Sequence, residues 1–301
     1  MLKEVLKGVM RFVAIMITVA LFSCGKVYDL NGFDWEPDLP LSDTVFNREI
    51  QILDLGVNNI PQTHKPMDNE DPLYFSLEKI SSVHIGYKAT ERWDMAFFGG
   101  SRVNITANNG SKQGVGYGSS GIGGLLVLDS AYSAVTSVPD DSRFVTPGNT
   151  GLAGFGEEIS PGGYAFYTFF DNIFRRDKIA NIDSPDPAVA ADANLYMHMI
   201  YCISEDFAKT FTGEYGTVKY KPIPKTIIIR TASGNYAKLE MQSLYKGTMN
   251  PMEMRRGTDK PLPYASFRYM VIKKEERRFG FVARKSKLTV NLSTKTRTVS
   301  N

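Results

Sequence analysis

The side chains best suited to hold a ligand lie between Gly163 and Tyr201. Five aromatic residues open this stretch: Tyr164, Phe166, Tyr167, Phe169 and Phe170. Aromatic rings form the walls of sites for apolar ligands, and His, Met, Cys or Tyr side chains donate to a metal that such a ligand carries. Potential donors follow along the chain: Met197, His198, Met199, Tyr215, Tyr220, Met249, Met252 and Met254. We therefore expect a binding site that uses this part of the chain.

Motifs of the common catalytic centres are missing from the sequence. It contains no Gly-x-Ser-x-Gly turn, no His-Glu-x-x-His pair and no cysteine close to a histidine in a motif-like frame. The glycine-rich run Gly114–Gly118 superficially suggests a nucleotide loop, but no strand–loop–helix unit with a downstream acidic residue surrounds it. The sequence predicts that the protein is not an enzyme.

A strand is the predicted setting of His198, because Leu195–Ile203 is an apolar, alternating run. Successive side chains of a strand face opposite ways, so Met197 and Met199 would point away from His198. Two interpretations stay open: His198 donates to a ligand, or it is a hydrogen-bonded histidine on a sheet face. Likewise, the methionines of the loop Gly247–Gly257 either donate to a ligand or fill gaps in the packing.

The clearest signals of regular structure lie between Lys225 and Tyr245. Thr226–Arg230 is rich in β-branched residues, residues 232–235 supply turn chemistry, and Tyr236–Tyr245 alternates. One face of the return strand is apolar, and the other carries Lys238, Glu240 and Gln242. This pattern predicts a β-hairpin with one dry face. Its three consecutive isoleucines predict a first strand that lies inside a sheet and is covered on both sides.

The remaining signals predict a mainly β protein with an antiparallel sheet and few short helices. Trp93, Met95 and Phe97 are expected on one face of a buried strand. Asp94 is expected to cap a turn or to pair with an arginine. Leu125–Val138 is the best candidate for a helical or mixed segment, since its apolar residues recur near helical spacing.

Four stretches of the chain are notable: the hairpin residues Ile-Arg-Thr-Ala-Ser-Gly-Asn-Tyr-Ala-Lys-Leu, Glu91–Phe97, Arg102–Gly110 and Ser266–Tyr269. In sequence and in order they resemble the HmuY family of haem-binding surface lipoproteins from Gram-negative anaerobes. The similar region spans roughly Asp71 to Lys273. The resemblance implies an all-β, hand-shaped fold that grips haem between two loops. Each loop would give one axial ligand, a pair of His in some members and a pair of Met in others. It further implies haem capture for iron acquisition and delivery to an outer-membrane haem transporter.

The chain departs from the family where the second axial ligand should lie. The loop Ser204–Lys225 contains neither His nor Met and offers Tyr215 and Tyr220 instead. His198 is the candidate for the first axial position, the methionines named above are further candidates, and the aromatic cluster is the candidate haem wall. The alternative is a surface lipoprotein with the same fold that has lost haem ligation and binds a glycan or a protein.

Residues 1–23 have the layout of a signal peptide, with a basic start and an apolar run at Phe12–Phe22. Leu21-Phe22-Ser23-Cys24 resembles a bacterial lipobox, although Phe22 stands where a smaller residue is usual. We therefore expect Cys24 to carry lipid, such as palmitate, and to anchor the protein at the outer membrane and the cell surface. The alternative is an uncleaved signal anchor with Cys24 as an ordinary core thiol.

The rest of the chain divides into a membrane tether at 24–43, a HmuY-like β domain at 44–273 and a basic C-terminal extension at 274–301. Within the extension, Leu288–Leu292 alternates and predicts an edge strand. Basic residues there are interleaved with acids and no nucleic-acid-binding motif is present, so no nucleic-acid partner is expected. Cys202 lies in an apolar stretch and is expected to be a buried thiol.

Overall fold

The predicted hairpin is present as β12 (Lys225–Arg230) and β13 (Tyr236–Ser243), with Arg230 opposite Tyr236. On its other side β12 pairs with β6 (Gly124–Asp129). Strand β12 is thus an inner strand, which explains why its three isoleucines are fully buried. The prediction of a first strand inside a sheet is confirmed.

The computed structural model describes residues 45–56, 69–111, 114–144, 152–155, 163–168, 173–211, 214–215, 218–219, 221–257, 259–280 and 285–300. All of them belong to one compact unit, Glu36–Asn301. The predicted signal peptide, Cys24, the whole tether and its boundary with the β domain lie outside the described residues, as do Phe169, Phe170 and Tyr220. The mainly β fold with few short helices is confirmed.

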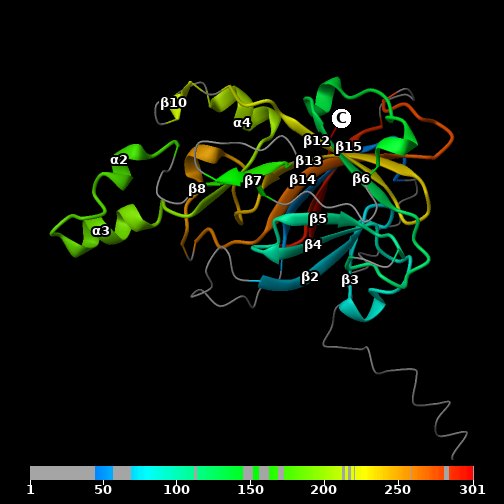
Figure 1. Ribbon diagram of the computed structural model, residues 1–301, viewed down its shortest axis with the longest axis horizontal. Helices are drawn as coiled ribbons and strands as arrows, with labels where there is room; N and C mark the ends of the chain where they lie inside the picture. The colour runs from blue at the N-terminus through cyan, green and yellow to red at the C-terminus, as the bar shows by residue number, and fades with distance from the viewer. Residues whose placement is uncertain are drawn as a thin grey trace, which may run out of the picture. The chain divides into compact units, whose positions relative to one another are not determined.

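Seven strands form the largest sheet, in the order β16-β15-β1-β14-β13-β12-β6 (Figure 1). Its other members are β1 (Glu49–Leu55), β14 (Ala265–Ile272), β15 (Lys287–Asn291) and β16 (Thr296–Ser300). Neighbours pair antiparallel except β1 and β15, which are parallel. The alternating C-terminal residues do form a strand, but β16 and not β15 is at the edge.

A second sheet, in the order β3-β2-β4-β5, packs against the first. It contains β2 (Asn69–Ser76), β3 (Ser81–Val83), β4 (Met95–Gly100) and β5 (Asn104–Ala107). The rings of Phe75 and Phe97 lie 5.6 Å and 6.0 Å from the ring of Phe267 on β14, so aromatic contacts join the two sheets. Trp93 does not share the face of Phe97 as predicted. It precedes β4 and packs with Tyr74, because the alternation of the strand does not extend to it.

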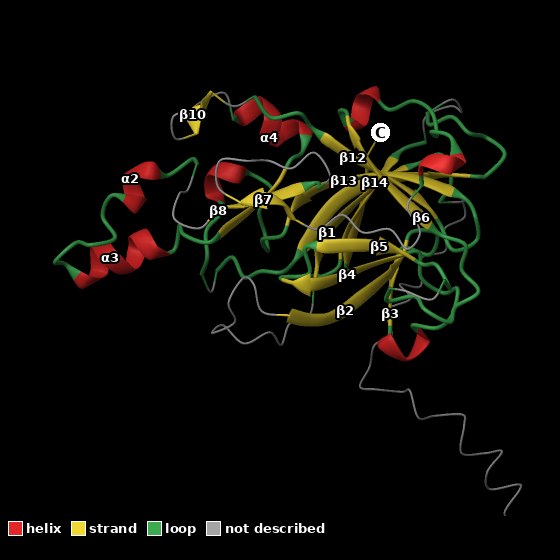
Figure 2. Ribbon diagram, in the orientation of Figure 1, coloured by secondary structure: helices red, strands yellow, loops and turns green. Residues whose placement is uncertain are grey.

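The remaining elements are short (Figure 2). A three-stranded sheet has the order β7-β8-β9, with β7 (Leu152–Phe155), β8 (Ala165–Thr168) and β9 (Met199–Cys202). The helices are α2 (Arg176–Ile179), α3 (Pro187–Asn194) and α4 (Glu205–Thr210), and β10 (Glu214–Tyr215) pairs with β11 (Val218–Lys219). Single 3-10 turns are η1 (Ile85–Tyr87), η2 (Tyr132–Ala134), η3 (Asp141–Arg143) and η4 (Pro251–Glu253). Among the described residues, no helix combines the length and the apolar composition needed to cross a bilayer.

Two further predictions concern local structure. The segment Leu125–Val138 is mixed and not helical, since it starts as strand β6 and then forms η2. Leu126 lies opposite Ile228, so pairing with β12 overrides the helical spacing. The return strand β13 was predicted to be buried on one face only, but all of its residues are buried, so both of its faces are covered. Its polar face is therefore covered as well.

A polar hub joins the hairpin turn to the second sheet. One oxygen of Asp94 accepts hydrogen bonds from Ser76 Oγ and from the backbone N–H of Leu77 and Glu78, at 3.1, 2.7 and 3.2 Å. The other oxygen accepts one from Ala232 N–H in the hairpin turn, at 3.1 Å. The prediction that Asp94 caps a turn is confirmed. Glu78 in turn accepts hydrogen bonds from three side chains of the turn: Thr231, Ser233 and Asn235.

Candidate functional site

The described members of the aromatic cluster are buried. Tyr164 is 1% exposed and donates its hydroxyl to the carbonyl of Val103. Phe166 is 2% exposed and stacks in a core with Tyr201 and Phe207, whose ring centroids lie 5.3 and 5.5 Å away. Tyr167 is 3% exposed, and strand alternation in β8 turns its side chain away from this core. Of the described cluster, we therefore consider Tyr167 the member best placed to meet a ligand.

The methionine candidates fall into two groups. Met199 and Met254 belong to the core around Phe166, and the sulfur of Met199 accepts a hydrogen bond from Tyr245 at 3.7 Å. In these positions they fill the packing, as the alternative interpretation proposed. Met249 and Met252 are 39% and 43% exposed, and Gln51 of β1 donates to the sulfur of Met249 at 3.8 Å. Met197 is buried, and Tyr215 is described by its backbone alone.

His198 lies in a bend immediately before β9, and not in the strand as predicted. Its φ is +54°, a left-handed conformation that ends the alternation one residue before the strand begins. The sequence could not reveal this, because the apolar pattern continues across the bend. The side chain of His198 is partly exposed, and its Nδ1 shares a hydrogen bond with the hydroxyl of Tyr167. That bond fixes the orientation of the imidazole ring.

One arginine, Arg256, acts on the charge of His198. Burial lowers the pKa of its imidazole, and the nearby charge of Arg256 lowers it further, so the neutral ring is favoured. The backbone N–H of Arg256 donates to the carbonyl of Leu195 at 2.7 Å, which holds the loop after η4 against this segment. Arg175 lies over the ring of Tyr196, at 4.9 Å from its centroid. A neutral imidazole with arginines nearby suits a metal centre that carries acidic groups.

A haem group would find one fitting donor in this neighbourhood. The oriented imidazole of His198 has the chemistry of an axial ligand. Met199 and Met254 do not fit the second position, because their side chains are enclosed in the core. Within the described ranges, no group of three or more His, Cys, Asp or Glu side chains could hold a metal ion directly.

Sequence reasoning missed a second site, on the polar face of the large sheet. Directly opposed residues of β1, β14 and β13 form two rows across this face. The first row is Gln51, Arg268 and Glu240, and the second row is Glu49, Met270 and Lys238. The segment after β6 and the segment around Phe279 cover them, and Phe279 N–H donates to the carbonyl of Thr136 at 2.9 Å. The signal available in the sequence was the polar row Lys238, Glu240 and Gln242 of β13, which alternation places opposite the apolar face of that strand.

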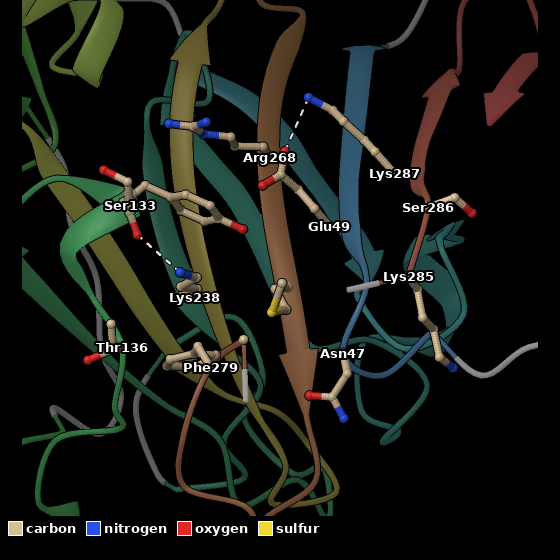
Figure 3. A pocket seen from close by; sticks show the side chains of 13 residues that line it. Asn47, Glu49, Ser133, Thr136, Lys238, Arg268, Phe279, Lys285, Ser286 and Lys287 are labelled. Atoms are coloured by element: carbon tan, nitrogen blue, oxygen red, sulfur yellow. Dashed lines mark hydrogen bonds and ion pairs between the residues drawn. The ribbon is translucent and has the colours of Figure 1, made fainter. Parts of the chain in front are cut away.

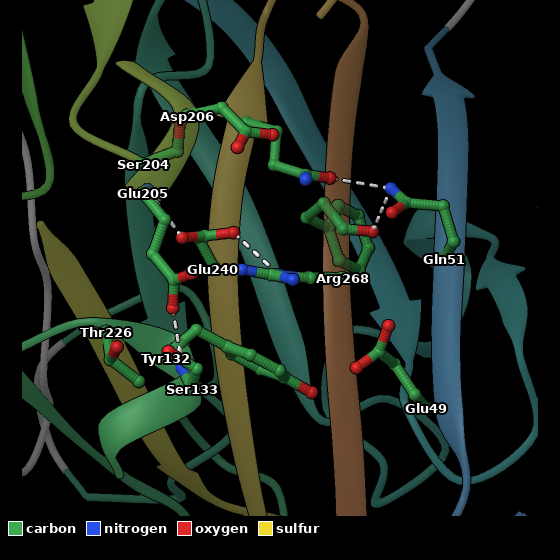
Figure 4. A network of polar contacts seen from close by, with 12 residues as sticks. Glu49, Gln51, Tyr132, Ser133, Ser204, Glu205, Asp206, Thr226, Glu240 and Arg268 are labelled. Atoms are coloured by element: carbon green, nitrogen blue, oxygen red, sulfur yellow. Dashed lines mark hydrogen bonds and ion pairs between the residues drawn. The ribbon is translucent and has the colours of Figure 1, made fainter. Parts of the chain in front are cut away.

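Arg268 is the centre of the first row (Figure 4). Its Nε lies 2.7 Å from Glu240, and one terminal nitrogen lies 3.3 Å from Glu205 at the start of α4. Burial raises the pKa of Glu240, and Arg268 partly offsets this effect. Burial also acts to raise the pKa of Glu205, but hydrogen bonds from Ser133 and Arg268 outweigh it, so this pKa lies below its ordinary value. The network ties α4 and η2 to the sheet.

Beside this network is a cavity of about 690 Å³ (Figure 3). Its lining comprises Asn47, Glu49, Tyr132, Ser133, Thr136, Lys238, Arg268, Met270, Phe279, Gly280, Lys285, Ser286 and Lys287. None of these residues was a candidate from the sequence, and none belongs to the surroundings of His198. The volume lies in the range of pockets that bind small molecules.

Comparison with known proteins adds no identification. No protein-family model matches the chain, and no curated protein matches it.

Proposed function

We propose that this protein is a lipid-anchored, cell-surface haem-binding protein of the HmuY type, in which His198 is the axial donor. The proposal is carried by the pair Tyr167–His198, because a hydrogen bond to Nδ1 orients an imidazole whose surroundings favour its neutral form. The four sequence stretches that resemble the HmuY family, in the family's order, support it.

The role of each group follows from its chemistry. A histidine whose Nδ1 is hydrogen-bonded coordinates iron through Nε2, so Tyr167 would hold the ring for His198 to bind. Arg256 acts on His198, whereas Arg175 and Arg255 contact Tyr196 and are paired with Asp177 and Asp259, so the charge of Arg256 is the one that suits a propionate of haem. Bound haem would supply an iron with axial positions and a flat apolar surface. Lipid on Cys24 would keep the protein at the outer membrane, where captured haem can pass to a transporter.

The test is a haemin titration of the soluble chain Lys26–Asn301, followed by absorbance in the oxidised and reduced states. We expect a saturable one-to-one change with resolved bands. His198→Ala should abolish the sharp Soret band, and Tyr167→Phe should weaken haem binding while it keeps the coordinated spectrum. Met254→Leu is the matched control, because this buried methionine is expected to pack and not to ligate. A His198→Ala spectrum identical to that of the unaltered protein would refute the role of His198.

A second candidate function is favoured by the enclosure of Met199 and Met254 in the core. With these donors unavailable, the same fold would serve as a surface lipoprotein that binds a glycan or a protein instead of haem. The titration separates the two functions. A featureless rise in absorbance, such as any apolar surface produces, would refute haem coordination and support this candidate.

A further inference from the structure

We infer that the cavity on the polar face of the large sheet is a binding site for a small hydroxylated organic acid, of the size and chemistry of an acidic sugar. This inference is independent of haem binding, since the cavity and the surroundings of His198 share no residue.

The first argument is an unsatisfied hydroxyl group. Tyr132 is 3% exposed and lines the cavity, and nothing among the described residues hydrogen-bonds to its hydroxyl. The hydroxyl end of the side chain points toward Glu49 (Figure 4). Burial raises the pKa of Tyr132 well above its usual value, and Glu49 raises it further, so the hydroxyl keeps its proton and can both donate and accept. Native proteins rarely leave such a group unpaired.

The second argument is an unsatisfied acceptor on the same cavity. The side-chain nitrogen of Asn47 donates to both carboxylate oxygens of Glu276, at 3.0 and 3.1 Å, and this orients the amide. The oxygen Oδ1 is buried and, within the described part of the chain, accepts no hydrogen bond. A ligand that satisfies both groups must donate to Asn47 and bond with Tyr132. A small molecule with several hydroxyl groups offers both kinds of bond.

The third argument is the sign of the charge. Four of the lining side chains are cationic, Lys238, Arg268, Lys285 and Lys287, and one is anionic, Glu49. Glu240 and Glu205 pair with Arg268 from behind the floor and Glu276 accepts from Asn47, so the excess of positive charge is confined to the side chains that line the cavity. Lys287 lies 3.2 Å from Glu49 at the rim (Figure 3). Because a concave, partly dry site strengthens a net positive potential, an acid is favoured over a neutral ligand.

The fourth argument is a rigid apolar wall. Two cations fix the ring of Tyr132, with the Lys238 ammonium 4.3 Å and the Arg268 guanidinium carbon 4.5 Å from its centroid. Met270 and the buried ring of Phe279 complete the apolar part of the lining. Apolar surface beside fixed polar groups matches a sugar ring, which has C–H faces and a hydroxylated edge. A fully apolar plate would leave the polar groups of this cavity unpaired.

The test uses the soluble chain Lys26–Asn301 with D-glucuronate as the probe and D-glucose as the neutral control, measured by calorimetry and saturation-transfer NMR. We expect saturable glucuronate binding that weakens with added salt, and glucose binding that is at least tenfold weaker. Tyr132→Phe removes only the unsatisfied hydroxyl, so its Tm should not fall, whereas its affinity for glucuronate should drop about tenfold. The matched control is Tyr201→Phe, at a buried tyrosine of the core around Phe166, and this variant should bind glucuronate as the unaltered protein does.

Three results would overturn the inference: no saturable binding of glucuronate, equal binding of glucose and glucuronate, or unchanged affinity in Tyr132→Phe. Each can occur whether or not haem binds, so failure here is distinguishable from failure of the proposed haem function. Lys287→Ala, at a half-buried lysine, adds a further check, because it should lower the salt dependence without loss of the fold.

Discussion

Replacing Asp94 with asparagine should change how the stability of the fold depends on pH. Asp94 is 4% exposed, and its carboxylate joins the second sheet to the hairpin turn of the large sheet. Burial raises the pKa of Asp94 to about 6, and the charge of Glu78 adds to this, although hydrogen bonds from Ala232, Glu78 and Ser76 act in the opposite direction. Asparagine has nearly the same shape and does not titrate.

The magnitude follows from proton linkage. The folded-state pKa of about 6 lies above the ordinary value of 3.8, so between these pH values the folded state binds more protons than the unfolded state. The free energy of unfolding therefore falls as pH rises through this window and is regained as pH falls. A difference of about two pKa units corresponds to roughly 3 kcal/mol. Asp94→Asn should lose this dependence.

The assay is urea denaturation of the unaltered protein and of Asp94→Asn between pH 8 and pH 3. We expect the stability of the unaltered protein, relative to the variant, to grow by about 3 kcal/mol over this range. Asp183→Asn, at an exposed aspartate, is the control and should follow the unaltered protein. A difference that stays constant or shrinks on acidification would refute the reasoning, since hydrogen bonds and not burial would then dominate the pKa of Asp94.

Three further predictions test the packing. Trp93→Ala should lower the free energy of unfolding by about 3–5 kcal/mol in urea titrations, because Trp93 is fully buried with its ring 4.8 Å from that of Tyr74; a loss below about 1 kcal/mol would contradict this packing. Gly234→Ala should lower the free energy of unfolding by about 1–2 kcal/mol, and by more than Gly247→Ala does. Both glycines have positive φ, but only at Gly234 would a Cβ meet a side chain, at 3.1 Å. Equal losses of stability in thermal unfolding would contradict a role for that contact. Cys202 should not react with Ellman's reagent in folded Lys26–Asn301, because the thiol is buried and burial raises its pKa. One reactive thiol should appear on denaturation. Rapid reaction of the folded protein would show that the thiol is accessible.

Elements could be predicted from the sequence where the local residue pattern and the tertiary contacts favour the same structure. The hairpin at Lys225–Tyr245 is one, because turn chemistry and β-branched strands specify it locally. The turn-capping role of Asp94 is another, since short polar side chains between strands commonly bond nearby backbone N–H groups. Pairing overrode local spacing in β6, and a single left-handed residue removed His198 from its expected strand. Neither effect leaves a periodic signal in the sequence.

The sequence by itself determined the mainly β class, the central hairpin and the residues that resemble a haem-binding family. Only the tertiary structure decided which polar residues are buried. Lys238 and Glu240 occupy the face of β13 that alternation predicts to be solvated, but η2, α4 and the segment around Phe279 cover that face. In the sequence, η2 lies 100 or more residues before β13, whereas α4 precedes it and Phe279 follows it by roughly 30 to 40 residues. Burial of this kind depends on long-range contacts, which the alternation of a single strand cannot encode.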